Sequence, residues 1–161
     1  MGSGYELKCK KCGYERPVRL GIGFSYPKVC ARILDAMKSG KYGKRFMEDA
    51  QNTPHAAVHQ EYEVFVCDQC GEWRVDETID LCAPIGEFKK REGRFSVAVD
   101  CPKDVQYVMT FDIGREYKII RSKQHRCSNC HHVLRPKKRN EMLKCPECGD
   151  PLKQGYELNW D

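Results

Sequence analysis

Four copies of a Cys-x-x-Cys motif are the residues of this chain whose types and spacing could do chemistry. The motifs are Cys9/Cys12, Cys67/Cys70, Cys127/Cys130 and Cys145/Cys148. Two thiolates three positions apart on a tight turn can bind one ion, so each motif supplies half of a tetrahedral site. Glycine directly follows three of the four motifs and lets the backbone turn back under a metal at little steric cost. The spacing therefore predicts two metal sites of four thiolates each.

Zinc is the metal that we predict for both sites, because four thiolates are a common ligand set of structural zinc. A catalytic zinc keeps an open coordination position, whereas four thiolates close the site. The sequence also contains no nucleophile elbow and no phosphate-binding glycine loop. We therefore expect two structural zinc ions in a protein that is not an enzyme.

The C-terminal motifs resemble those of zinc-ribbon and rubredoxin-type knuckle proteins. Residues 145–149, Cys-Pro-Glu-Cys-Gly, resemble the second knuckle of that superfamily, and residues 127–130 resemble the first. The whole chain, with its segment 20–27, is also similar to small uncharacterised bacterial double zinc-ribbon proteins. The resemblance implies a metal-stabilised fold and no activity. With iron in place of zinc, the C-terminal site would resemble the centre of a rubredoxin-like electron carrier.

Four motifs allow three pairings, and loop length is the criterion that we apply. The 14 residues between Cys130 and Cys145 fit a ribbon hairpin, which leaves the first two motifs to pair across 54 residues. Loop entropy grows only with the logarithm of length and does not forbid such a long insertion. The predicted segments are an N-terminal zinc ribbon with a helical insertion (1–83), connecting β-hairpins (84–126) and a C-terminal zinc ribbon (127–161).

Apolar periodicity in the sequence predicts an α+β fold. An apolar stripe with helical spacing predicts a helix at about 26–38, and a second helix follows at about 42–51. Apolar and polar residues alternate on both sides of the first motif and over 61–66, which favours strands next to the metals. Similar alternation over 95–99 and 105–111, with a turn at Glu92-Gly93, predicts the connecting hairpins.

Charge is distributed unevenly along the chain. The formal net charge is +5 with neutral thiols, and two tetrathiolate zinc sites of net −2 each would reduce it to about +1. Residues 46–80 hold nine acids and one base, whereas 115–148 hold ten bases and three acids. The distribution of charge therefore says more about partners than the total does.

A basic cluster lies between the last two motifs and consists of Arg135, Lys137, Lys138 and Arg139. Such side chains displace condensed counterions from a phosphate backbone, so we predict that the cluster contacts nucleic acid or a nucleoprotein. Two alternatives stay open: the cluster docks on the acidic segment 46–80 of this chain or of a second copy, or it is simply solvated. No aromatic residue lies between Cys127 and Leu152, which weighs against a stacking platform for single-stranded bases.

A protein adaptor or inhibitor that uses the helical and acidic N-terminal half is the second functional hypothesis. We expect Cys30 to be a buried thiol on the helical stripe, and Cys82 and Cys101 to be free thiols. His55 and His59 are four apart, a spacing that would face one metal on a helix, but no Glu directly follows His55 and we expect both to be ordinary surface or core histidines.

No apolar run approaches the roughly 20 residues of a membrane span, and the N-terminus lacks the layout of a signal peptide. Eleven cysteines without an export signal favour a reducing, cytoplasmic compartment, where thiols hold metal. The sequence leaves the oligomeric state open.

Overall fold

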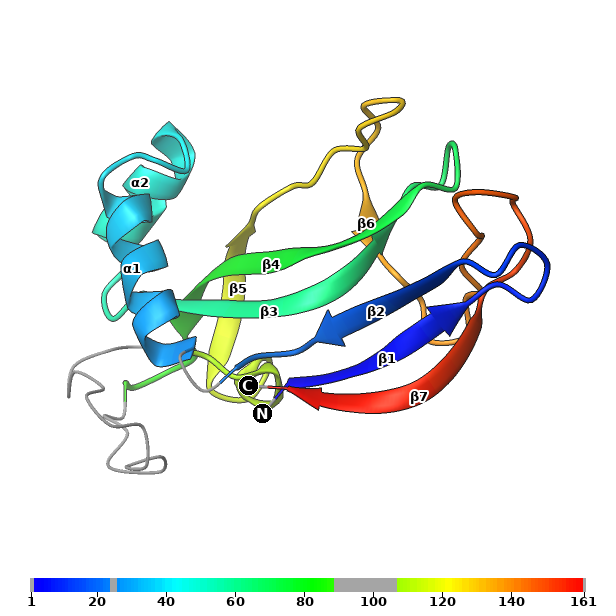
Figure 1. Ribbon diagram of the computed structural model, residues 1–161. Coiled ribbons are helices and arrows are strands. Elements are labelled where there is room, and N and C mark those ends of the chain that lie inside the picture. Colours follow the sequence, from blue (N-terminus) through cyan, green and yellow to red (C-terminus); the bar gives the residue numbers. More distant parts are fainter. Residues whose placement is uncertain (1, 24–25, 89–106, 161) are drawn as a thin grey trace. The chain divides into compact units, whose positions relative to one another are not determined.

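The computed structural model describes residues 2–23, 26–88 and 107–160, and these residues form the predicted α+β fold (Figure 1). The described residues contain two helices and two antiparallel sheets, with strand orders β2-β1-β7 and β5-β4-β3-β6. The elements are β1 (Gly2–Lys8), β2 (Glu15–Leu20), α1 (Tyr26–Lys38), α2 (Lys44–Asn52), β3 (Ala57–Val66), β4 (Trp73–Pro84), β5 (Tyr117–Ser122), β6 (Arg135–Pro136) and β7 (Lys153–Trp160).

The chain forms two compact units whose segments alternate along the sequence. Unit 1 consists of Met1–Gly23, Glu61–Glu77 and Gln124–Asp161, and unit 2 consists of Phe24–Gln60 and Thr78–Lys123. All four Cys-x-x-Cys motifs belong to unit 1. The units therefore do not follow the three consecutive segments 1–83, 84–126 and 127–161 that the sequence suggested.

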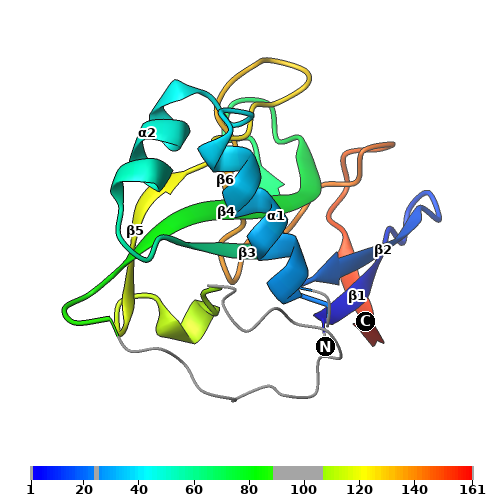
Figure 2. The same ribbon diagram turned by 90° about the vertical axis from the view of Figure 1, so that its left-hand side faces the viewer.

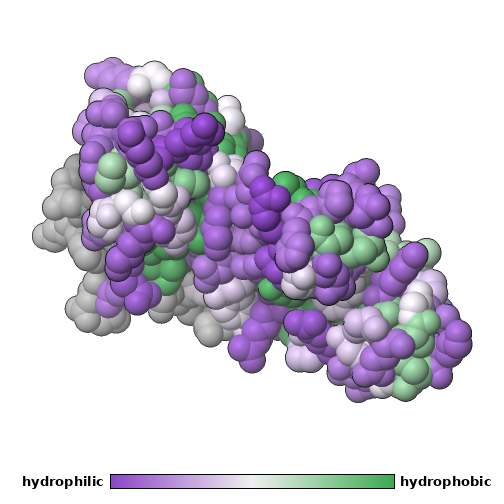
Figure 3. All heavy atoms as spheres, turned by 90° about the horizontal axis from the view of Figure 1, so that it is seen from above, coloured by the Kyte–Doolittle hydropathy of each residue, from purple (hydrophilic) through white to green (hydrophobic). Residues whose placement is uncertain are grey.

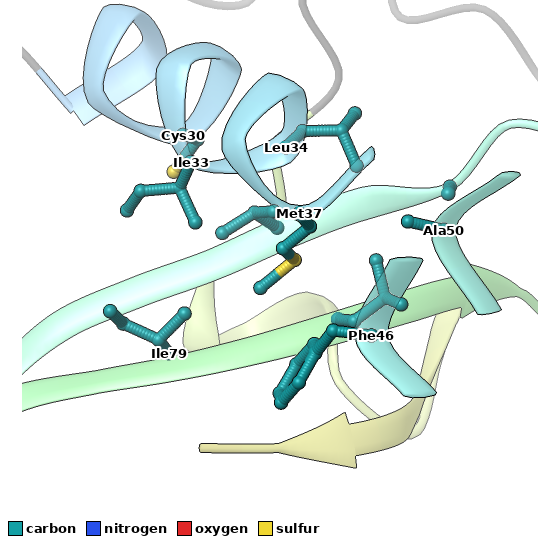
Figure 4. Packing of buried hydrophobic residues seen from close by; sticks show 10 residues of the cluster. Cys30, Ile33, Leu34, Met37, Phe46, Ala50 and Ile79 are labelled. Carbon is teal, nitrogen blue, oxygen red and sulfur yellow. The ribbon is translucent and has the colours of Figure 1, made fainter. Parts of the chain in front are cut away.

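Unit 2 has an apolar core in which the predicted helices cover the sheet (Figure 2). Helix α1 begins and ends where the apolar stripe predicts, and its buried side chains pack against Phe46 of α2 and Ile79 of β4 (Figure 4). Met37 and Leu81 are fully buried in this core. Cys30 lies in the same core, as expected for a buried thiol.

Unit 1 is built on the sheet β2-β1-β7, in which β1 is the central strand (Figure 1). The Trp160 indole N–H donates to the backbone oxygens of Ser3 and Leu20 at 3.0 and 3.1 Å, so this ring crosses the N-terminal end of β1. A Cβ atom at Gly2 would lie 2.3 Å from the Trp160 ring, and one at Gly4 would lie 2.2 Å from the Val18 oxygen. Both glycines are therefore required by the close packing of β1 against its neighbours.

One local prediction is wrong. Residues Thr110–Asp112 form a 3-10 turn rather than part of a strand over 105–111, because the Asp112 carboxylate accepts the Met109 backbone N–H at 2.8 Å and caps the turn. Residues from Ala57 onward are extended, so His55 and His59 do not share a helix face. The predicted turn at Glu92-Gly93 and the strand 95–99 lie outside the described residues.

Hydrophilic residues predominate over the described part of the face seen in Figure 3. None of the helices in residues 2–23, 26–88 and 107–160 is long and apolar enough to cross a membrane.

Candidate metal centres

The eight cysteines of the four motifs form two groups, each with its sulfur atoms within 4.8 Å of one another. We call Cys9, Cys12, Cys145 and Cys148 the outer site, because they come from the first and last motifs. Cys67, Cys70, Cys127 and Cys130 are the inner site. In each motif the first cysteine is buried and the second is exposed or half-buried. Both sites thus present two sulfur atoms to the protein interior and two to the surface.

The distances between sulfur atoms in both groups are close to those around a metal ion with tetrahedral coordination. In the outer site the Cys9–Cys148 and Cys12–Cys145 sulfur pairs are each 3.5 Å apart. In the inner site the Cys67–Cys130, Cys70–Cys127 and Cys70–Cys130 sulfur pairs are 3.4, 3.5 and 3.7 Å apart. A tetrahedral zinc with bonds of about 2.3 Å places its sulfur ligands about 3.8 Å apart. Each group can therefore hold one metal ion after small adjustments of the side chains.

The pairing of the motifs is the main correction to the sequence analysis. We predicted that Cys9/Cys12 pairs with Cys67/Cys70 and that Cys127/Cys130 pairs with Cys145/Cys148, and both pairings are wrong. The outer site joins the first motif to the fourth, and the inner site joins the second to the third.

Strand register explains the nested pairing. Lys8 and Leu7 of β1 pair with Lys153 and Gln154 of β7, so the motif that follows β1 meets the motif that precedes β7 (Figure 1). In the same way Val66 of β3 pairs with Arg135 of β6, which brings the motif after β3 to the motif before β6. A longer loop adds only about 0.6 kcal/mol per doubling of its length, which is less than several backbone hydrogen bonds contribute.

All four motifs share one backbone geometry. The first cysteine accepts a hydrogen bond from the N–H four residues later, at 2.9–3.1 Å, and its own N–H donates to the oxygen five residues later at 2.8 Å. The residue four positions after the first cysteine has a positive φ in every motif, namely Gly13, Gly71, His131 and Gly149. Glycine adopts this conformation without strain, whereas His131, with a φ of 61°, does not.

His131→Gly is therefore expected to stabilise the protein by about 0.5–1 kcal/mol, since relief of the left-handed strain exceeds the added entropy of the unfolded chain. His131 is exposed, so the loss of its side chain creates no cavity. Denaturant unfolding of the metal-loaded protein measures the change. Gly149→Ala is the reciprocal control and should destabilise by a similar amount. Equal stability of wild type and His131→Gly would contradict the strain at this position.

Backbone hydrogen bonds favour the thiolate form of Cys9 and Cys67, whereas burial raises the pKa of the Cys127 thiol to about 12. The backbone N–H of Cys12 is the main cause that lowers the pKa of the Cys9 thiol to about 7, and that of Cys70 does the same for Cys67. Metal binding requires thiolates, so a lowered pKa reduces the cost of releasing the proton.

Polar contacts also connect the two knuckles within each site. In the outer site Lys11 donates to Asp150 at 2.9 Å. In the inner site the Glu72 carboxylate accepts hydrogen bonds from the Ser128 hydroxyl and, at 2.6 Å, from the Cys127 thiol. Glu72 could not be predicted as part of the inner site, since nothing in the chain order places it beside the third motif.

The structure divides the predicted basic cluster, because Arg135 is engaged by carboxylates, whereas Lys137 is half-buried and its ammonium donates to the Lys138 backbone oxygen at 3.2 Å. Arg135 binds the carboxylates of Asp68 and Glu141 at 2.6–2.9 Å, and this pairing lowers the pKa of Glu141 to about 2. Arg135 is therefore a positioning residue that fastens its loop to the second knuckle. Lys138 and Arg139 are exposed, and their side chains make no ion pair within the described residues.

Lys137, Lys138 and Arg139 line a groove of unit 1 with a volume of about 430 Å³. Tyr5 of β1 and Tyr62 of β3 line the same groove. These tyrosines could not be predicted as neighbours of the basic cluster, because they are far from it in the chain and only the fold brings them beside it.

Cys30, Cys82 and His59 belong to unit 2 and to neither group of four cysteines. Burial raises the pKa of the Cys30 and Cys82 thiols to about 12, and both thiols lie in cores of unit 2. His59 is buried, with its Nδ1 3.2 Å from an oxygen of Asp80. Cys101 lies outside the described residues.

No family model matches this chain, and neither a curated protein nor a solved structure matches it. The two four-cysteine clusters could each hold a metal ion, and their paired knuckles suggest zinc-ribbon-like sites.

Proposed function

We propose that unit 1 is a zinc-stabilised module that binds nucleic acid, free or within a nucleoprotein, through the groove beside Lys137, Lys138 and Arg139. The observation that carries this proposal is that three cations, two of them exposed, line one groove together with two tyrosines. Cations supply phosphate contacts and aromatic rings supply contacts to bases. Zinc is the proposed ion in both sites, because closed sets of four thiolates are its structural ligand sets.

The two metal sites would act as the scaffold of this module. The outer-site motifs flank β1 and β7, and the inner-site motifs flank β3 and β6. Lys137 follows β6 directly, and its backbone N–H donates to the Val64 oxygen of β3 at 2.7 Å. The cations are therefore held on a loop that is anchored by both strand pairing and the inner site, rather than on a free hairpin tip.

Replacing Lys137, Lys138 and Arg139 together by alanine is expected to abolish most salt-dependent binding of oligonucleotides. Three phosphate contacts imply a slope of log affinity against log salt of about −2.7 for duplex and about −2.1 for single strands. The affinity of the wild type should then fall roughly 20- to 40-fold between about 50 and 200 mM salt. Fluorescence anisotropy with labelled oligonucleotides measures both the affinity and the slope.

The matched control variant replaces Lys28, Arg32 and Lys41, three exposed cations of unit 2, and should keep the wild-type slope. All variants should retain two metal ions, because no replaced residue is a ligand. If the wild type binds oligonucleotides no better than the groove variant at low salt, the proposed function is wrong.

A further inference from the structure

We propose that the groove of unit 1 takes a single strand, with a base stacked on Tyr62 and the phosphates along Lys137, Lys138 and Arg139. This inference rests on the proposed function and specifies its ligand. It reverses the expectation from the sequence, where no aromatic residue lies close to the basic cluster in the chain.

The shape of the site favours a single strand over a duplex. Proteins read a duplex with elements that protrude into its grooves, whereas the cations and tyrosines of unit 1 line a hollow. Bases in a duplex are stacked and paired, so their faces are not accessible to a side chain. Only an unpaired base can enter a hollow of about 430 Å³ and lay its face on an aromatic ring.

Two contacts fix the position of the Tyr62 ring beside the groove. Its hydroxyl donates to a carboxylate oxygen of Glu77 at 2.9 Å. The Trp160 ring packs against it nearly edge-on, with centroids 5.9 Å apart and an interplanar angle of 66°. A ring that is already ordered loses little entropy when a base binds. Tyr62 is therefore a preorganised contact, while Tyr5 adds a second ring from β1.

Charge determines how a strand would be oriented across the groove. Glu61 and Glu63 of β3 also line it, and their carboxylates repel phosphates. The cations come from one continuous loop after β6. A bound strand would therefore run its phosphates along this loop and turn its bases toward the tyrosines.

The test compares an oligothymidine of about 12 nucleotides, within the usual site sizes for single strands, with a duplex of the same length. The single strand should bind more tightly than the duplex at equal salt. Tyr62→Ala should weaken binding of the single strand roughly 5- to 150-fold, the effect of losing one stacked base. Its salt slope should stay that of the wild type, because stacking neutralises no phosphate.

Tyr62→Phe is the matched control, since it keeps the ring and removes only the hydroxyl that binds Glu77. It should bind within a few-fold of the wild type. Tyr62→Leu fills a similar volume without a ring, should weaken binding as Tyr62→Ala does, and serves in its place if Tyr62→Ala loses a metal ion. Two metal ions per chain in each tested variant establish that unit 1 is intact.

The outcomes separate this inference from the proposed function. Equal binding of duplex and single strand, or a wild-type affinity of Tyr62→Ala, overturns the single-strand inference while salt-dependent binding through the loop still stands. A loss in Tyr62→Phe as large as in Tyr62→Ala overturns the stacking role. If neither nucleic acid binds, both proposals fail.

Discussion

Replacing Cys127 and Cys145 together by serine is expected to release both metal ions and to unfold unit 1. These cysteines belong to different sites, so each substitution removes one ligand from a separate group of four. Structural zinc contributes roughly 10–16 kcal/mol in isolated zinc fingers, as much as the roughly 5–15 kcal/mol that keep a whole domain folded. The loss of both ions should therefore remove most of the stability of unit 1.

Elemental analysis and native mass spectrometry measure the number of ions in each variant. The matched controls are Cys9→Ser with Cys145→Ser, and Cys67→Ser with Cys127→Ser. Both members of each control pair lie in one site, so one ion should remain. If instead the first motif paired with the second and the third with the fourth, Cys127 and Cys145 would lie in one site. The variant with Cys127→Ser and Cys145→Ser would then keep one ion. Retention of one ion there would contradict the nested arrangement.

The absorption spectrum and elemental analysis of the purified wild-type protein test the identity of the metal. Zinc with four thiolates is colourless, and two zinc ions per chain are expected. A red protein with sulfur-to-iron absorption bands would contradict zinc and support the rubredoxin-like alternative.

Local patterns in the sequence predict the helices and the metal ligands well. The stripe of α1 is a short-range signal that needs only one apolar face to be buried, and Met37 lies where that signal places it. The cysteine spacing is equally local, since the two thiolates of a knuckle are positioned by their own turn. Both kinds of prediction depend on residues within a few positions of one another.

The pairing of the knuckles could not be predicted in this way, because it depends on which strands are neighbours. The antiparallel contact between β1 and β7 joins the two ends of the chain. The pattern Gln154, Tyr156, Leu158 and Trp160 carries a weak strand signal, but no local feature shows that its partner is the strand before Cys9. Loop length was the wrong criterion. The entropic cost of closing a loop grows only with the logarithm of its length, so a longer loop costs less than a strand pairing contributes.

The groove of unit 1 also depends on contacts between residues that are far apart in the chain, so its residues could not be predicted from local patterns. Arg135 and Arg139 look equivalent in the sequence, yet Arg135 is neutralised by Asp68 and Glu141, whereas Arg139 lies at the groove. Docking of the basic segment on the acidic segment of its own chain, one of the open alternatives, thus occurs at Arg135.

Met37→Ala is expected to destabilise the protein by about 2–5 kcal/mol while both metal ions stay bound. Met37 is fully buried between α1 and the strands of unit 2, so its truncation leaves a cavity that the surrounding side chains fill only partly (Figure 4). The four-cysteine groups belong to unit 1 and share no core residue with this cluster. Denaturant unfolding measures the loss of stability, and elemental analysis measures the metal.

Met142→Ala is the matched control, because it makes the same chemical change at a side chain of unit 1 that is 73% exposed. Its effect should stay within about 0.5 kcal/mol, as for most surface substitutions. A loss of metal in Met37→Ala under native conditions would show that the core of unit 2 supports the sites of unit 1. Retention of both ions together with lower stability means that the metal sites of unit 1 do not depend on the core of unit 2.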